Sequence, residues 1–174
     1  MSSSRSIRTV ARVLFDTSRP DQLGLIALVY TMGSAIALAD GASVDPIVTG
    51  VGLLALLLVS MSIHYANEYA DYFADYLAVR TPFSGGSGAL QRTGLPRRLP
   101  LQGAIVTALL GVGVGLLGRS VGYPPLALVV LFVIAAFGWA YSVGPALAWH
   151  GLGELDNAAL GGIALPVYTV GQRH

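Results

Sequence analysis

An all-α, polytopic transmembrane helix bundle of about five spans is the fold class that the sequence predicts. Of the 174 residues, 54% are hydrophobic and 11% are charged, whereas a soluble domain carries about 25% charged residues. The mean hydropathy is +0.67. The hydrophobic residues also form long runs rather than amphipathic stripes. Runs of this length are typical of helices that cross a bilayer, because a helix satisfies its own backbone hydrogen bonds there.

The chain begins with a polar stretch and then becomes apolar. Residues 1–20 are expected to form a basic N-terminal segment with a short interfacial helix over 7–15 and without a cleavable signal peptide. The transmembrane domain is expected to occupy 21–174. Its first span is predicted at 21–39, where the following Asp40 and Gly41 end the helix.

The second span has an unusual continuation. It is predicted at 46–65, and its helix is expected to run on through Asp75 to about residue 79. Polar and apolar segments then alternate: a polar loop at 80–100, a third span at 101–117, a fourth at 124–143, a polar segment at 144–156 and a short fifth span at 157–170. The third span is rich in Gly and Ala, which allows close helix packing in a membrane.

The arginines predict the orientation of the spans. Four precede the first span and four lie in the loop after the second, but the loop after the first has none and the loop after the third has only Arg119. Because basic loops stay inside, we expect the N-terminus and the loops around 67–98 and 144–156 to be cytoplasmic. The expected location is the plasma membrane of a prokaryote.

Composition excludes several kinds of chemistry. The chain has no cysteine, which excludes disulfides and thiolate metal sites. All ten basic residues are arginine, so neither a Schiff base nor a lysine phosphate clamp is available. The formal net charge is only +1, which argues against nucleic acid as a partner.

The strongest candidate site is the set Asn67, Asp71 and Asp75. On one continuous helix, residues at i, i+4 and i+8 share a face, so their side chains would line a stripe about 12 Å long. Acids near the C-terminal end of a helix are unfavourable for its dipole, which suggests a bound cation. An amide oxygen and carboxylates suit Mg²⁺, which often shares its ligands with phosphates. The alternative is a solvated helix end.

The loop after Asp75 is the second candidate. Ser84, Gly85, Gly86, Ser87 and Gly88 can turn backbone N–H groups toward an anion or act as a hinged lid, and Arg80 flanks them. A glycine-rich linker is the alternative interpretation of this loop.

A few further polar residues have competing interpretations. Tyr141 lies at the end of the fourth span, where an aromatic belt is the ordinary explanation. His64 could support the metal site or be an interior histidine, and Glu68 is either a weaker ligand candidate or an exposed carboxylate. His150 could carry protons or be a solvated loop residue. Glu154 and Asp156 are polar residues at the start of the fifth span.

These residues together resemble the UbiA superfamily of intramembrane prenyltransferases. Asn67, Asp71 and Asp75 resemble its first aspartate-rich motif, and Thr81-Pro-Phe-Ser-Gly-Gly-Ser-Gly88 resembles the loop that follows. Tyr141-Ser-Val-Gly-Pro145 and Gly151-Leu-Gly-Glu154 resemble the second-loop region of the branch that prenylates 1,4-dihydroxy-2-naphthoate. Arg19-Pro20 before the first span also fits.

The resemblance implies a helical bundle whose cavity opens toward the cytoplasm. It implies transfer of a prenyl group from a polyprenyl diphosphate to an aromatic acceptor, as in menaquinone or ubiquinone synthesis. Asn67, Asp71 and Asp75 would then hold Mg²⁺ and the diphosphate. Arg80 and the residues from Ser84 to Gly88 would contact the diphosphate or cover it, and Tyr141 would lie near the reacting prenyl carbon.

The resemblance covers only the N-terminal half of such an enzyme. No second pair of aspartates spaced by four follows Asp75, although the family has one in its later half. We therefore expect a truncated form, a remnant, or one part of a split protein that associates with a separately encoded half or a second copy. The remaining alternatives are a noncatalytic membrane protein of the same fold and a small transporter coupled to protons or cations.

Overall fold

The computed structural model describes residues 6–77 and 86–171, and these residues form helices and connecting turns without a β-strand. The helices are α1 (Ile7–Thr17), α2 (Pro20–Ala39), α3 (Pro46–Ala70), α4 (Tyr72–Leu77), α5 (Ala89–Thr93), α6 (Arg98–Gly118), α7 (Pro125–Ser142), α8 (Gly153–Ala159) and α9 (Leu165–Val170). A π-helical turn at Leu160–Ala164 joins α8 to α9, and 3₁₀ turns occupy Arg119–Val121 and Leu147–His150. The predicted all-α bundle is confirmed.

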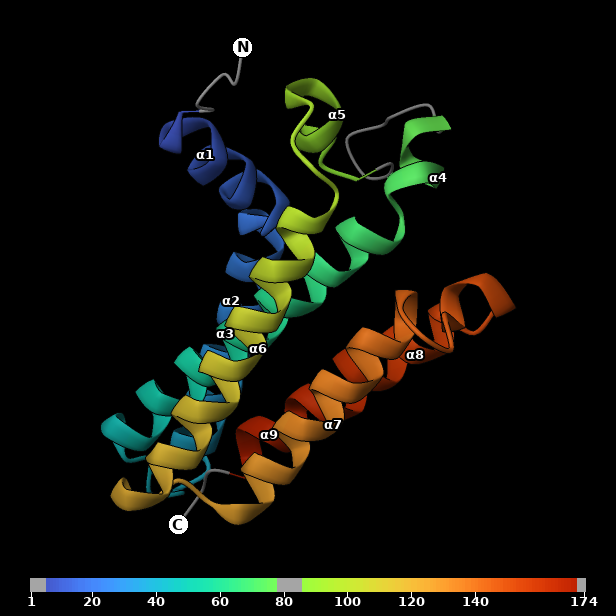
Figure 1. The fold of residues 1–174 in the computed structure, drawn as a ribbon. Helices are drawn as coiled ribbons and strands as arrows, with labels where there is room; N and C mark the ends of the chain where they lie inside the picture. The colour runs from blue at the N-terminus through green and yellow to red at the C-terminus, as the bar shows by residue number, and fades with distance from the viewer. Residues whose placement is uncertain (1–5, 78–85, 172–174) are drawn as a thin grey trace.

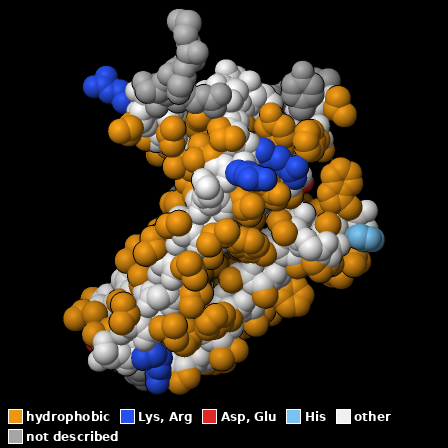
Figure 2. Space-filling model, in the orientation of Figure 1, with side chains coloured by type: hydrophobic (Ala, Val, Ile, Leu, Met, Phe, Trp, Pro, Cys, Tyr) orange, Lys and Arg blue, Asp and Glu red, His pale blue; other side chains and the backbone are white. Residues whose placement is uncertain are grey.

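Among the described residues, four helices are long and apolar enough to cross a membrane: α2, α3, α6 with the following 3₁₀ turn, and α7. Their outward surfaces remain apolar, and hydrophobic side chains cover the visible flanks of the bundle in Figure 2. Leu109 and Leu117 on α6, for example, are 69% and 76% exposed. Such surfaces suit the hydrocarbon of a bilayer, so the chain is an integral membrane protein by the length and composition of its helices.

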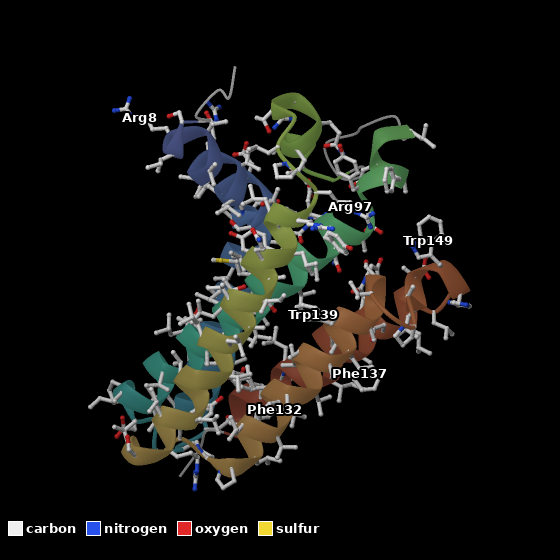
Figure 3. The ribbon with its side chains drawn as sticks, viewed as in Figure 1. Arg8, Arg97, Phe132, Phe137, Trp139 and Trp149 are labelled. Atoms are coloured by element: carbon white, nitrogen blue, oxygen red, sulfur yellow. The ribbon has the colours of Figure 1, made fainter. Side chains whose placement is uncertain are left out.

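Helix α3 is the centre of the bundle. It packs along α6 and against α7 and α2, while α9 packs on α2 and α7 (Figure 1). The main core contains apolar residues of these helices, including Leu56, Val59 and Leu131. Figure 3 shows Trp139 on α7, whose indole nitrogen donates to the Ser62 hydroxyl of α3 at 3.1 Å.

Hydrogen bonds of tyrosine hydroxyls hold the helices together at the end of the bundle where α3 begins. Tyr123 donates to Tyr168 at 2.6 Å, and Tyr168 donates to the carbonyl of Gly52 at 2.7 Å. Tyr30 on α2 donates to the carbonyl of Thr49 at 2.9 Å. Because buried hydroxyls need partners, these bonds fix α2 and α9 against the first half of α3.

The opposite end carries the short helices. There α1 packs on α5 through a small core that includes Val13, Leu90 and Leu95. The Tyr65 hydroxyl of α3 donates to the carbonyl of Leu14 at 2.9 Å, which ties α1 to the main bundle. The C-terminal ends of α3 and α7 and the N-terminal ends of α6 and α8 lie at the same end of the bundle as α1, α4 and α5 (Figure 1).

The prediction that the second helix continues without interruption to about residue 79 was wrong. Helix α3 ends at Ala70, Asp71 takes a non-helical conformation, and α4 resumes at Tyr72 and turns away from α3 (Figure 1). The Arg97 side chain explains the break: its Nε donates to the carbonyl of Tyr69 at 2.9 Å, and its guanidinium lies 4.3 Å from the centre of the Tyr69 ring. A side chain that takes over a terminal carbonyl ends a helix as a cap does.

Candidate functional site

A polar pocket of about 230 Å³ lies between the start of α2, the second half of α3, the end of α7 and the start of α8. Its polar lining residues are Arg19, Gln22, His64, Asn67, Tyr141, Asp156 and Asn157. Ile63, Gly138 and Leu160 complete the wall. The pocket therefore combines residues from both ends of the described chain with the first member of the predicted aspartate-rich motif.

Three buried polar atoms in this pocket have no hydrogen-bond partner within the part of the chain that the structure describes. They are His64 Nε2, Asn67 Oδ1 and Asp156 Oδ2, and all three residues line the pocket. The His64 and Asp156 side chains are only 9% and 6% exposed. Buried polar atoms almost always have a partner, which is protein, ordered water or a ligand. Their concentration in one pocket indicates a site that receives polar groups from outside the chain.

Close helix packing brings these side chains together. A Cβ atom on Gly153 would lie 3.1 Å from Cε2 of Tyr141, so the missing side chain allows α8 to approach the end of α7. A Cβ atom on Gly138 would collide with Cδ1 of Ile63, so α7 also approaches α3 closely. The two glycines therefore permit the contacts that enclose the pocket on the α7 side.

Arg19 contributes the positive charge of the pocket. It occupies the left-handed region with φ of 53°, directly before Pro20 at the start of α2. This conformation is uncommon for a residue with a side chain and often accompanies a functional constraint. The guanidinium is near enough to Asp71 to oppose the rise of its pKa.

Asp71 lies where α3 ends and faces α7. Its Oδ2 accepts a long hydrogen bond of 3.5 Å from the Ser142 hydroxyl. Burial raises the pKa of Asp71 above its ordinary value of 3.8, and repulsion from Asp75 adds to this effect. Arg19 and Ser142 act in the opposite direction. A nearby cation would stabilise the charged form of Asp71 against both its burial and the repulsion from Asp75. The electrostatics of Asp71 therefore suit a positively charged ligand.

The helix that would carry Asn67, Asp71 and Asp75 on one face is interrupted at Asp71, although the backbone N–H groups of Asp71 and Asp75 still donate to the carbonyls of Asn67 and Asp71 at 2.8 Å each. Asn67 points its unpartnered oxygen into the pocket, and Asp71 faces α7. Asp75 lies on α4 against Gly86, where an added Cβ would collide with Asp75 Oδ2. Asp75 is near enough to Asp71 for its negative charge to raise the pKa of Asp71.

The glycine-rich loop is bound to Glu68 in its described part. Glu68 is 2% exposed, and its carboxylate accepts from the Ser87 hydroxyl at 2.6 Å and from the Ser87 backbone N–H at 3.2 Å. The Ser87 N–H, one of those expected to turn toward an anion, thus points at the protein's own carboxylate. Gly88 follows with φ of 63° and precedes α5, a backbone angle that favours glycine. Glu68, a weaker candidate from the sequence, is the residue that holds this loop.

Other predicted site residues have a simpler description. Arg80, Ser84 and Gly85 lie outside the described residues. His150 is exposed and its Nδ1 lies 3.2 Å from the carbonyl of Ala146, and Glu154 is exposed on α8. Tyr141 lines the polar pocket with Asn67, so these two predicted residues share one site.

An apolar pocket of about 150 Å³ adjoins the polar one deeper in the bundle. The two pockets share Ile63, His64 and Leu160 in their walls. The rest of the apolar lining is Ile26, Leu56, Ser60, Ile134, Gly161 and Leu165. The two adjoining pockets therefore match a molecule that lies along α3 with a polar head in the polar pocket and an apolar body in the apolar pocket.

The described residues contain no group of three or more His, Cys, Asp or Glu side chains that could hold a metal ion by themselves. Mg²⁺ commonly takes only one or two carboxylates and completes its octahedron with water and substrate phosphates. The unpartnered Asn67 oxygen and the paired acids Asp71 and Asp75 fit that pattern of partial coordination.

Comparison with models of protein families, with curated proteins and with solved structures finds no match for this chain.

Proposed function

We propose that this chain carries the donor site for Mg²⁺-dependent transfer of a prenyl group from a polyprenyl diphosphate to an aromatic acceptor in quinone or related lipid synthesis. One observation carries the proposal: the unpartnered, buried oxygen of Asn67 lies one turn before Asp71 and lines a polar pocket that adjoins an apolar one. The UbiA-like motif is the additional sequence argument.

Asn67, Asp71 and Asp75 would hold Mg²⁺. The bound ion supplies charge neutralisation for a departing diphosphate. Asp71 and Asp75 repel each other in the free protein, so they are set up to share a cation. Arg19 adds a fixed positive charge within reach of Asp71, and a guanidinium is a good partner for phosphate oxygens.

The apolar pocket would receive the first part of the prenyl chain. Its walls are almost wholly apolar, so a bound chain excludes water from the reacting carbon. Tyr141 would lie near that carbon, because it lines the adjoining polar pocket. Arg80 and the segment from Ser84 to Gly88 would cover the diphosphate.

The arginine distribution supports a cytoplasmic location for this end of the bundle. The proposed membrane is the plasma membrane of a prokaryote. The exposed apolar faces of α6 and α7 can contact lipid or pack against a further helical unit. A separately encoded C-terminal half or a second copy would supply the remaining metal ligands of the resembled family.

Prenyl transfer by membranes that contain this chain tests the proposal. The assay supplies Mg²⁺, a labelled polyprenyl diphosphate and either 1,4-dihydroxy-2-naphthoate or 4-hydroxybenzoate. We expect a prenylated product that disappears in Asp71→Ala and persists in Glu154→Ala, whose carboxylate is exposed on α8. Absence of product from correctly inserted protein would reject catalysis by this chain alone.

A further inference from the structure

A basic pocket lies apart from the proposed donor site, between α1 and α5 at the end of the bundle where α3 ends (Figure 1). Its volume is about 400 Å³. The charged residues that line it are Arg8, Arg12 and Asp16 on α1 and Arg92 on α5. Three positive charges thus face one negative charge, so the pocket attracts a ligand with a net negative charge.

Two of these arginines have no ion-pair partner among the described residues. Arg8 and Arg12 lie one helical turn apart on α1, and both side chains are exposed. The Arg8 side chain extends away from the bundle in Figure 3. A guanidinium has several N–H donors in one plane and can bind two oxygens of a phosphate at once. The two side chains therefore offer donors that suit a phosphate group.

Arg92 is held on the α5 side of the basic pocket. Its Nη1 donates to the carbonyl of Ser87 at 3.0 Å, and its Nη2 lies 3.6 Å from Oδ2 of Asp16. The Arg92 and Asp16 side chains are 57% and 34% exposed, so their ion pair contributes little stability. A bound anion can replace Asp16 as the partner of Arg92, while the hydrogen bond to Ser87 keeps the guanidinium in place.

The basic pocket lies at the height of lipid head groups. The span α2 begins at Pro20 directly after α1, and the span α6 begins at Arg98 shortly after α5, so both walls adjoin the start of a span. Ile7 and Phe15 on α1 are 86% and 63% exposed. With Ala11 between them they form an apolar face of α1 next to the face that carries the arginines. A helix with this division of its surface lies in the interface of a bilayer.

We infer that the basic pocket binds the phosphate of an anionic phospholipid, with the arginines of α1 on one side and Arg92 on the other. The acyl chains of this lipid would enter the bilayer beside Ile7 and Phe15. A zwitterionic head group fits less well because it would bring a cationic group to the arginines. The bound lipid would join α1 to α5 in addition to the small core that already connects them. This assignment is independent of the proposed donor site.

Titration with three matched probes tests the inference. Native mass spectrometry follows binding to the purified full chain in a neutral detergent. The probes are dioleoylphosphatidylglycerol, dioleoylphosphatidylcholine, and glycerol 3-phosphate, which has the phosphate but no acyl chains. One basic residue near an anionic membrane surface gives about a fivefold gain in binding. We therefore expect the first phosphatidylglycerol to bind at least about fivefold more tightly than phosphatidylcholine, and glycerol 3-phosphate to bind most weakly.

Three variants should change the affinity for phosphatidylglycerol in different directions. Arg12→Gln should weaken binding by about fivefold, because it removes one unpaired guanidinium. Asp16→Asn should strengthen binding, because it removes the negative charge of the pocket. Arg98→Gln is the matched control: it removes the same charge from an exposed residue at the same end of the bundle, outside the pocket, and should leave the affinity unchanged.

The gain expected for Asp16→Asn separates ligand binding from a structural role, because damage to the fold would not strengthen binding. Equal affinity for the two phospholipids, equal losses in Arg12→Gln and Arg98→Gln, or an Asp16→Asn variant that binds no more tightly than the wild type would overturn the inference. Glycerol 3-phosphate that binds as tightly as phosphatidylglycerol would also overturn it and assign the pocket to a soluble phosphate compound.

Discussion

At the scale of single residues, Glu68 and Ser87 make the most informative contact. Both oxygens of a carboxylate that is 2% exposed accept hydrogen bonds from one serine, at 2.6 and 3.2 Å. The Ser87 hydroxyl in turn accepts from the backbone N–H of Ala89 at 3.1 Å, and the Ser87 carbonyl accepts from Arg92 at 3.0 Å. This contact joins α3 to the entrance of α5 and keeps Gly86 beside Asp75.

A double-mutant cycle between Glu68 and Ser87 should measure this contact. Glu68→Gln removes the charge, and Ser87→Ala removes the hydroxyl donor, so each variant loses stability and the double variant loses less than the sum. Coupling energies within hydrogen-bonded pairs are about 0.5–3 kcal/mol. Reversible unfolding in mixed micelles would give the free energies.

The control for this cycle is Ser120→Ala combined with Glu68→Gln. Ser120 follows the far end of α6 and donates to the carbonyl of Leu117, so it should show no coupling to Glu68. Coupling near zero for Glu68 and Ser87 as well would mean that the loop is not held in this way.

Sequence reasoning found part of the site at this scale. Spacing alone pointed to Asn67, Asp71 and Asp75, and composition made acids near an apolar run conspicuous. Asp156 was considered only as a polar residue at the start of a helix. Its place in the polar pocket depends on the close approach of α8 to the end of α7, which no local pattern encodes. Arg19 needed a left-handed backbone to reach the pocket, and Glu68 needed a partner 19 residues away.

At the scale of secondary-structure elements, small residues decide how closely α3 and α6 pack. An added Cβ on Gly111 would lie 2.9 Å from Cγ2 of Val59 and 3.0 Å from the carbonyl oxygen of Ala55. A Cβ on Gly103 would lie 3.0 Å from the Tyr65 ring. Since backbone atoms cannot rotate away, α6 would have to move if Gly111 gained a side chain.

Gly111→Ala should therefore destabilise the bundle by about 1–3 kcal/mol, the usual cost of overpacking. Gly113→Ala is the matched control on the same helix, because a Cβ there meets nothing within 4 Å. Relief of the glycine penalty should make that control neutral or more stable by roughly 0.5–1 kcal/mol. Both values come from reversible unfolding, and equal stability of the two variants would contradict the tight α3–α6 contact.

The spans were predictable from sequence, but the end of α3 was not. Run length and hydropathy located α2, α3, α6 and α7 within a few residues, because a bilayer requires long apolar helices. The break at Asp71 depends on Arg97, which lies 28 residues beyond the Tyr69 carbonyl that it binds. Helical periodicity cannot reveal a cap supplied from that distance, so the sequence predicted one uninterrupted helix. The short helix α5, inside the expected loop, was likewise not anticipated.

At the scale of the whole molecule, the described part of the chain is an apolar helix bundle with charged residues at both ends and the polar pocket at one of them. Hydrogen bonds of buried tyrosines hold the bundle together where α3 begins, while Asp71, Arg19 and the polar pocket lie where α3 ends. The apolar pocket leads from the polar pocket into the helix bundle. The arrangement suits an amphipathic substrate that enters with its charged group at the membrane surface and its chain among the helices.

Mg²⁺-dependent binding of a polyprenyl diphosphate to the purified full chain tests this account most directly. The account predicts saturable binding of labelled geranylgeranyl diphosphate that requires Mg²⁺, is lost in Asp71→Ala and is retained in Asp40→Ala, where an exposed acid at the end of α2 has been removed. Circular dichroism and membrane insertion should be the same for all three proteins. Binding that is independent of Mg²⁺, or equal in Asp71→Ala and the wild type, would contradict the assignment of Asp71 to a magnesium diphosphate site.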